Sequence, residues 1–346
     1  MQHQQLPRNA HSQRGVAILT VLIIVALVMT LATVILARQS RTVRQTDNYQ
    51  SLERAWQYAF ALEQYVGMEL QRDLKTNKYD ALTESWGRLK LKDLKLEEGN
   101  SVTVGIFTGK LEDLQARFNI NNVLIQPQTP PNQQQKTYLN NLIHDAGLPD
   151  GFTSAVIDWI DDDEQLSDGE SAESDYYLSS TLPFRAANMQ FLDPSELRLL
   201  RLTMSANKKP IALNKLQQLV STIPTNQIIT VNANTANKQV LTAIGLNSQQ
   251  IESIMDLRKT KPFETAQDLA NKASLTSEQK LILGVSSNYF RLQGEIKVGR
   301  ARVYLSSVFF RAPDKPIRVI MRQFDRVNDT QPATTTDDAD TTPATS

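Results

Sequence analysis

The hydrophobic positions of this chain begin with one long, unbroken apolar run. Val16 to Ala37 covers 22 residues and contains no charged residue, no glycine and no proline. A helix needs about 20 apolar residues to cross a hydrocarbon core ~30 Å thick, and it satisfies its own backbone polar groups inside lipid. The run therefore predicts a membrane-spanning helix near the N-terminus.

After this run the pattern becomes amphipathic without a break. Apolar residues recur at spacings of three and four, which places them on one helical face: Leu52, Trp56, Ala59, Leu62, Val66 and Leu70. One continuous helix from about Val16 to about Leu74 would be ~90 Å long at 1.5 Å per residue. Its first half lies in lipid, and its second half needs a soluble partner for the face that contains Trp56.

Alternating stretches on both sides of a long middle section predict that partner. They are Ser101–Phe107, Tyr289–Val298, Ala301–Arg311 and Pro316–Phe324, with turn signals at Gly99-Asn100 and Gly299-Arg300. Strands before and after the middle section imply one antiparallel sheet interrupted by an insertion. The expected fold class is therefore α+β, with a long N-terminal helix packed on an antiparallel sheet and a large, mostly α-helical insert.

The middle section contains a weak internal repeat. Asn119-Ile120-Asn121 and Asn232-Ala233-Asn234 each precede a helix that ends near a glycine, Gly147 in the first case and Gly245 in the second. An Asn or Thr before each helix would supply an N-cap oxygen. The pattern predicts two helix–turn–helix units.

An acidic segment lies inside the first unit. Asp158 to Asp175 holds nine carboxylates in 18 residues and no Lys or Arg. A solvated loop is one interpretation, because charge runs are usually exposed. A calcium site is the other, because Trp159 and Tyr177 would hold the run against the domain, and Ca²⁺ takes six to eight oxygen ligands. An EF-hand starting at Asp161 does not fit, because Leu166 stands where the loop requires glycine.

Three interpretations compete for the N-terminal boundary. The apolar run is too long for a signal peptide, whereas a plain signal anchor fits its length. The third interpretation uses the polar leader, which ends in Gly15 directly before the run. This boundary resembles the leader of type IV pilin-like proteins. The resemblance implies a pilin-like fold, cleavage after Gly15 by a prepilin peptidase, and N-methylation of Val16.

Thr20 narrows the family. Most pilins and pseudopilins carry glutamate at the fifth position after the cut, and the K-type minor pseudopilin of type II secretion is the one that lacks it. A carboxylate in lipid is costly and needs a partner. Without this acid the subunit has none to offer to a subunit above it, which suits a position at the tip of the filament.

The acidic segment also resembles this K-type family. The similar stretches are Asp158-Trp159-Ile160-Asp161-x-Asp163, Ala172-Glu173-x-Asp175-Tyr176-Tyr177 and Arg185-Ala186-Ala187-Asn188. In that family the helical insert binds calcium, which implies one or two structural Ca²⁺ ions here. The ligands carried over by position are Asp161, Asp163, Glu173 and Asp175, with Asp168 and Asn188 as further candidates.

The resemblance implies a domain organisation and a set of partners. The expected segments are a leader (1–15), a transmembrane segment (16–37), the first part of a pilin-like domain (38–118), the insert (119–285), the last strands (286–326) and a disordered tail (327–346). The expected location is the inner membrane, with the soluble part in the periplasm at the pseudopilus tip. The partners implied are the I- and J-type minor pseudopilins, other pseudopilins, the prepilin peptidase, and the secretin or a secreted substrate.

Composition argues against other functions. The formal net charge is zero, there is no cysteine, and two of the three histidines precede residue 16, so a His-cluster zinc site and a Ser-His-Asp triad are disfavoured. We therefore expect that the protein is not an enzyme. The alternative is a membrane-anchored helix-hairpin-helix DNA receptor, which Asn232–Leu269 resembles. Phosphate binding needs clustered positive charge, and this segment lacks it, so no nucleic acid is expected.

Overall fold

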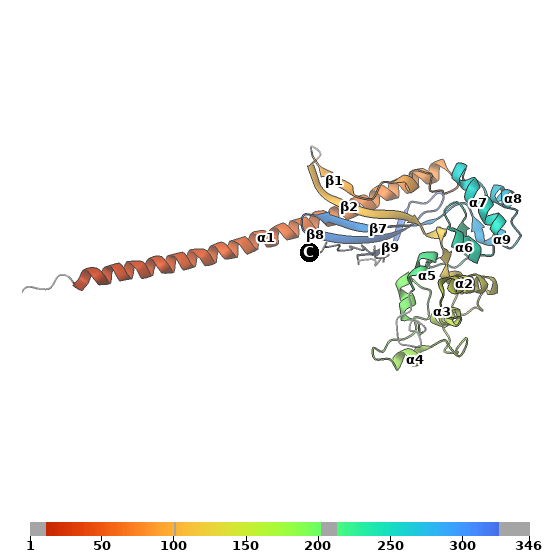
Figure 1. Cartoon of the computed structure of the whole chain (residues 1–346), viewed down its shortest axis with the longest axis horizontal. Helices are drawn as coiled ribbons and strands as arrows, with labels where there is room; N and C mark the ends of the chain where they lie inside the picture. The colour runs from red at the N-terminus through yellow and green to blue at the C-terminus, as the bar shows by residue number, and fades with distance from the viewer. Residues whose placement is uncertain (1–11, 100–101, 202–212, 325–346) are drawn as a thin grey trace, which may run out of the picture.

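The computed structural model describes residues 12–99, 102–201 and 213–324 (Figure 1). Its dominant element is helix α1, which runs from Ser12 to Thr76 over 65 residues. The N-terminal half of α1 projects away from the rest of the molecule, and the second half packs on a sheet. The continuous helix expected from the sequence is therefore confirmed.

The buried face of α1 differs slightly from the expected one. Ala55, Ala59 and Leu70 are fully buried against the sheet, whereas Leu52 is 38% exposed. Trp56 lies on the flank of the helix, where its ring meets Phe324 edge-on at 4.5 Å. The small alanines allow the helix to approach the sheet closely. The large indole, one residue further round the helix, covers the margin instead of the centre.

The sheet has five antiparallel strands in the order β1-β2-β7-β8-β9. Their bounds are Leu94–Glu98, Val102–Asp113, Tyr289–Val298, Ala301–Phe310 and Arg318–Gln323. Gly109 and Gly294 lie opposite each other in the register of β2 and β7. The ring of Phe107 occupies the space above this pair, since a Cβ at Gly109 would lie 2.3 Å from its Cζ. The antiparallel sheet on a helix confirms the expected pilin-like architecture.

The insert leaves the sheet after β2 and returns at β7. Its first unit contains β3 (Phe118–Asn119), α2 (Gln133–Ala146), α3 (Phe152–Ile160), α4 (Ser174–Leu178), α5 (Asn214–Leu219) and β4 (Val220–Ser221). Its second unit contains β5 (Val231–Asn232), α6 (Lys238–Ala243), α7 (Ser248–Thr260), α8 (Ala266–Lys272), α9 (Gln279–Ile282) and β6 (Leu283–Gly284). Short 3-10 turns occupy Trp86–Arg88, Leu114–Ala116, Ile120–Val123 and Pro194–Leu199.

The two units are built alike. In each, a two-residue strand pairs in parallel with a second strand at the end of the unit, β3 with β4 and β5 with β6. Gly147 is the C-cap of α2, and Gly245 follows the C-cap of α6. Both glycines adopt positive φ, 73° and 87° respectively. The weak repeat in the sequence thus corresponds to a repeated structural unit.

Buried asparagines hold these units together through their side-chain amides. Asn119 donates to the carbonyl of Ile223 and accepts from its N–H, each at 2.9 Å. Three further pairs make the same two bonds at the same distances: Asn121 with Phe191, Asn122 with Ile229, and Asn234 with Phe263. These amides replace a backbone partner for otherwise unsatisfied peptide groups. The expected N-cap role belongs to other asparagines, Asn132 for α2 and Asn237 for α6.

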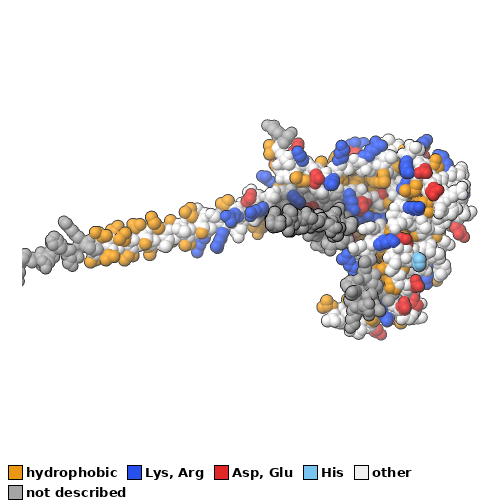
Figure 2. All heavy atoms as spheres, in the orientation of Figure 1, with side chains coloured by type: hydrophobic (Ala, Val, Ile, Leu, Met, Phe, Trp, Pro, Cys, Tyr) orange, Lys and Arg blue, Asp and Glu red, His pale blue; other side chains and the backbone are white. Residues whose placement is uncertain are grey.

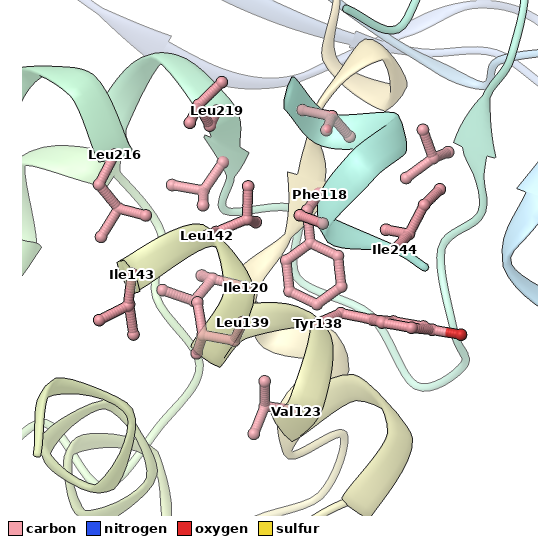
Figure 3. Packing of buried hydrophobic residues seen from close by; sticks show 14 of the residues in the cluster. Phe118, Ile120, Val123, Tyr138, Leu139, Leu142, Ile143, Leu216, Leu219 and Ile244 are labelled. Atoms are coloured by element: carbon pink, nitrogen blue, oxygen red, sulfur yellow. The ribbon is translucent and has the colours of Figure 1, made fainter. Parts of the chain in front are cut away.

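One apolar core runs through both units (Figure 3). Phe118 and Ile120 from the start of the first unit face Tyr138 and Leu142 of α2, and Ile244 of the second unit closes the same cluster. Phe118 and Tyr138 meet edge-on at 6.4 Å. The insert therefore has a core separate from the one that α1 forms with the sheet.

Candidate metal centre and membrane anchor

The acidic segment begins at the end of a completely buried helix. All nine residues of α3 are buried, and the chain leaves it at Asp161. It returns to the protein at Glu173, which is buried at the N-terminus of α4. The intervening loop folds back so that carboxylate oxygens of Asp161, Asp163 and Glu173 lie within 4.8 Å of one another.

Aromatic side chains fix both ends of this loop. Trp159 meets Tyr177 edge-on at 5.5 Å and stacks on Phe191 at 6.2 Å. Tyr177 also stacks on Phe184 at 5.0 Å. These contacts hold α3 and α4 together, as the aromatic residues flanking the acidic segment predict. The three carboxylates therefore belong to one rigid neighbourhood and not to a free loop.

Two other acids in the segment have structural partners. Asp158, fully buried, accepts the N–H of Ser167 with both carboxylate oxygens at 3.1 Å. Asp168 accepts the N–H groups of Glu170 and Ser171 at 2.8 and 2.9 Å. Burial acts to raise the pKa of Asp168, but these bonds and one from Ser154 outweigh it, and the pKa is lowered. Asp168 thus closes a turn and is not among the three clustered carboxylates.

Two of the three clustered acids have buried oxygens without a partner, whereas Asp163 accepts the N–H of Gln165 at 2.7 Å. Among the described residues, both carboxylate oxygens of Glu173 and Oδ1 of Asp161 are buried without a hydrogen bond. The side-chain amide oxygen of Asn188 is also buried without a hydrogen bond. Burial, and then repulsion from neighbouring carboxylates, raises the pKa of Asp161 to about 7 and that of Glu173 to about 8. Buried, unpaired oxygens are rare in folded proteins, and a hard cation with oxygen ligands would satisfy them.

The sequence-predicted ligands are therefore only partly brought together. Asp161, Asp163 and Glu173 form one cluster, and Asn188 has an unsatisfied oxygen. Asp175 is exposed in the first turn of α4 and is not in this cluster. The three carboxylates supply the charge that a calcium site needs, so the residues present fit a Ca²⁺ ion.

A second group of acids was not anticipated from the sequence. Asp73, Asp80 and Glu84 are all buried and also lie close enough to share one ion. Here, however, a cation is already supplied by the protein. The buried guanidinium of Arg311 contacts Asp73 at 3.1 Å and pairs with Asp80. Glu84 instead accepts from the N–H of Ala81 and from Nε1 of Trp86, so all three acids have partners within the protein.

The apolar half of α1 fits a membrane anchor. The helix from Val16 onward is long and apolar enough to span a bilayer, and its apolar window is not buried by the rest of the molecule. Thr20 lies in this part, and its hydroxyl donates to the carbonyl of Ala17 at 2.9 Å. Its polar group is thus satisfied within its own helix and needs no partner in lipid.

A membrane-anchoring helix that continues onto an antiparallel sheet defines the class of pilin-like subunits, here enlarged by a helical insert. Models of the type II secretion system protein K match residues 116–225 and 231–286. The chain is 30% identical to type II secretion system protein K of Pseudomonas aeruginosa, covering 94% of this chain and 97% of that protein. It is 27% identical to the Aeromonas hydrophila protein K, covering 91% and 98%. This chain therefore belongs to the type II secretion system protein K family.

A solved structure supports the fold independently. The chain is similar to one in the GspK-GspI-GspJ complex of the enterotoxigenic Escherichia coli type 2 secretion system, with a TM-score of 0.66 and 24% identity. The match covers 82% of this chain and all of that one. As a member of the protein K family, the protein is a minor pseudopilin of type II secretion, a structural subunit anchored to a membrane by its N-terminal helix.

Proposed function

We propose that this subunit occupies the tip of the type II secretion pseudopilus and initiates and caps its assembly, without catalysis of its own. The observation that carries the proposal is the position of the insert, which lies at the end of α1 away from the apolar half (Figure 1). In a filament whose subunits align by their helices, this bulk occupies the space of a further subunit. Thr20 supports the same arrangement, since it offers no carboxylate to a neighbour.

The proposed location follows from the anchor. The helix crosses the inner membrane once, with the sheet and insert in the periplasm. The leader ends at Gly15, a prepilin peptidase removes it, and Val16 becomes the methylated N-terminus. The I- and J-type minor pseudopilins are the proposed partners, because the similar solved chain belongs to a complex with two such proteins.

The tip position can be tested with one introduced thiol, because the chain contains no cysteine. Leu182 lies in the insert and is 81% exposed, so Leu182→Cys provides a single accessible site for a gold label. We expect electron micrographs of pseudopili to show label at one end only. Label distributed along the filaments would contradict the proposal, and the unsubstituted chain controls for adventitious labelling.

The role of Thr20 can be tested in the same filaments. Thr20→Glu restores the acid that other pseudopilins carry, and we expect it to place some label within filaments. Thr33→Glu is the matched control, because Thr33 also lies on the lipid-exposed part of α1 and also donates to its own helix, at 2.8 Å to Met29. If the Thr20→Glu filaments still carry label only at one end, Thr20 has no role in capping.

We further propose that Asp161, Asp163 and Glu173, with Asn188 beside them, hold a structural Ca²⁺ ion, and that Asp175 and Asp168 lie near it. One or two ions fit the number of acids. The ion replaces repulsion among carboxylates by attraction. Because it binds the folded loop only, it stabilises the protein by about 2.7 kcal/mol when free ion exceeds its dissociation constant 100-fold.

The calcium proposal predicts that removing the clustered charges abolishes the stabilisation by Ca²⁺ but stabilises the metal-free protein. In wild-type protein, EDTA lowers the melting temperature, Ca²⁺ restores it, and Mg²⁺ restores less because it demands tight octahedral geometry. Asp161→Asn with Glu173→Gln removes the response to Ca²⁺ and raises the melting temperature in EDTA, because the repulsion is gone. Asp150→Asn with Glu170→Gln is the control, since both are exposed acids outside the cluster. Equal melting curves of wild type in EDTA and Ca²⁺ would refute the proposal.

A further inference from the structure

A basic cluster follows the apolar half of α1 directly. Arg38, Arg41 and Arg44 are all exposed, and the first acidic residue of the whole chain is Asp47. Figure 2 shows a zone of blue, basic side chains where the orange, apolar stretch of the helix ends. Within the described residues, the three guanidinium groups make no ion pair, so nothing in that part of the subunit accounts for them.

The spacing of the arginines matches the thickness of a headgroup layer. The 22 residues from Val16 to Ala37 form a helical segment ~33 Å long at 1.5 Å per residue, which fills the hydrocarbon core. Arg41 and Arg44 then lie ~4.5 and ~9 Å beyond Arg38 along the axis. The headgroup layer is roughly 5–8 Å deep on each side. Because long basic side chains bend toward the interface, all three guanidinium groups reach it.

The residue types fit phosphate as the ligand. All three basic positions are arginine, whose planar fork binds phosphate with two parallel hydrogen bonds. The spacing of three residues turns each arginine by 60° from the last on an α-helix, so the groups cover a third of its circumference. Their placement on the far side of the span also opposes the usual bias of Lys and Arg toward the cytoplasm. A specific attraction on that side offsets this bias.

We propose that Arg38, Arg41 and Arg44 bind the phosphate groups of anionic phospholipids in the periplasmic leaflet of the membrane that α1 crosses. This contact fixes the depth of the helix and retains the subunit in the bilayer until assembly draws it out. The inference rests on the proposed topology, in which the sheet and insert lie outside the cytoplasm. It does not depend on the tip position or on calcium.

The full-length protein in phosphatidylcholine vesicles tests this directly. Electron spin resonance of spin-labelled phosphatidylglycerol and spin-labelled phosphatidylcholine measures how strongly each lipid associates with the helix. We expect the wild type to prefer phosphatidylglycerol, and the preference to weaken with salt. Replacing all three arginines with glutamine should lower it by about fivefold or more, the effect of even one basic side chain at an anionic surface. Replacing them with lysine should retain part of it.

The controls separate local binding from general charge. Lys90, Lys92 and Lys95 are exposed on the soluble domain, so changing all three to glutamine removes the same charge far from the bilayer and should leave the preference unchanged. Arg8 and Arg14 of the leader are the same in every variant. An unchanged preference in the triple Arg→Gln variant would overturn the proposal, as would an equal loss in the lysine control. A variant that keeps its lipid preference but fails to join the other minor pseudopilins would instead assign the arginines to an acidic partner surface.

Discussion

Arg311 is the residue whose loss should damage the fold most. Its side chain is 1% exposed, and it lies just beyond the end of β8. It donates to the carbonyls of Leu70 and Ser287 at 2.9 and 3.2 Å and pairs with Asp73 and Asp80. Desolvation lowers the pKa of Arg311, whereas the hydrogen bond to Asp73 and its charge act to raise it.

Arg311→Met keeps much of the volume and removes every one of these bonds. Two buried carboxylates then lose their cation, and breaking a buried pair in this way costs about 3–5 kcal/mol. At roughly 2–4 °C per kcal/mol for domains of this size class, the melting temperature of a soluble fragment beginning at Gln45 should fall by about 10 °C. Circular dichroism on heating measures this fall.

Two further variants test whether the loss of stability comes from the unpaired buried charges. Arg302→Met removes a partly exposed ion pair between Arg302 of β8 and Glu295 of β7, and such pairs contribute about 0–1 kcal/mol. Adding Asp73→Asn and Asp80→Asn to Arg311→Met should recover part of the loss, because the uncompensated charges are gone. A fall no larger than that of Arg302→Met, or no recovery in the triple variant, would refute the reasoning.

Two other predictions concern the acidic cluster and the leader. The pKa values of Asp161 and Glu173, about 7 and 8, lie above their ordinary values of 3.8 and 4.5, so metal-free protein should lose stability as pH rises from about 4 to about 8; melting curves in EDTA check this, and the gain from Ca²⁺ should grow over the same interval because the ion binds the deprotonated acids. Mass spectrometry of the protein purified from membranes should give an N-terminus at methylated Val16, and Gly15→Trp should leave the full-length precursor. A mature wild-type chain that begins at Met1 or after Ala37 would contradict the proposed cleavage after Gly15.

Much of the fold could be predicted because it depends on local periodicity. The apolar run and the three–four spacing specify α1, and alternation with glycine turns specifies the β7–β8 hairpin, whose strands have the expected bounds except that β8 ends one residue earlier. Trp56 was misplaced because periodicity locates a face only to within one residue. On that face the size of the side chain decides which residue faces the sheet, and Ala55 takes that place.

The candidate metal centre was partly predictable for a similar reason. Nine acids in one segment indicate a site, but which of them converge depends on how the loop turns. The backbone bonds that Asp168 accepts turn it into a loop-closing residue, and the path of α4 leaves Asp175 exposed. Neither feature has a signature in the spacing of acids.

The network around Arg311 could not be predicted, because its members are far apart in sequence. Arg311 and Asp80 are separated by 231 positions, and each is an ordinary charged residue in its local pattern. Asn119 and Asn234, whose amides make paired hydrogen bonds, could be recognised in the sequence because both belong to the repeated Asn-x-Asn motif. Their function differed from the expected helix cap because an amide that is buried beside an open peptide group bonds to that group first.

Ser287 shows how these polar contacts connect the three parts of the molecule. It lies between β6, the last element of the insert, and β7 of the sheet. Its N–H donates to Asp80 at 2.7 Å, its hydroxyl donates to Asp113 at 2.7 Å, and its carbonyl accepts from Arg311. Every polar group of this one residue is therefore bonded across the joint.

Asp113 continues the connection into the insert. Its Oδ2 accepts from Asn232 and Thr235 at 3.0 and 2.6 Å as well as from Ser287. The carboxyl is fully buried, and burial raises its pKa even though these bonds favour the ionised form. Such a group tolerates little movement, because any opening of the joint would leave it unsatisfied in an apolar environment. The insert is thus held at a fixed angle to the sheet and, through Arg311 and Asp73, to the end of α1. A subunit that caps a filament needs this rigidity, because its helix is aligned by its neighbours and only a rigid joint keeps the insert over the end.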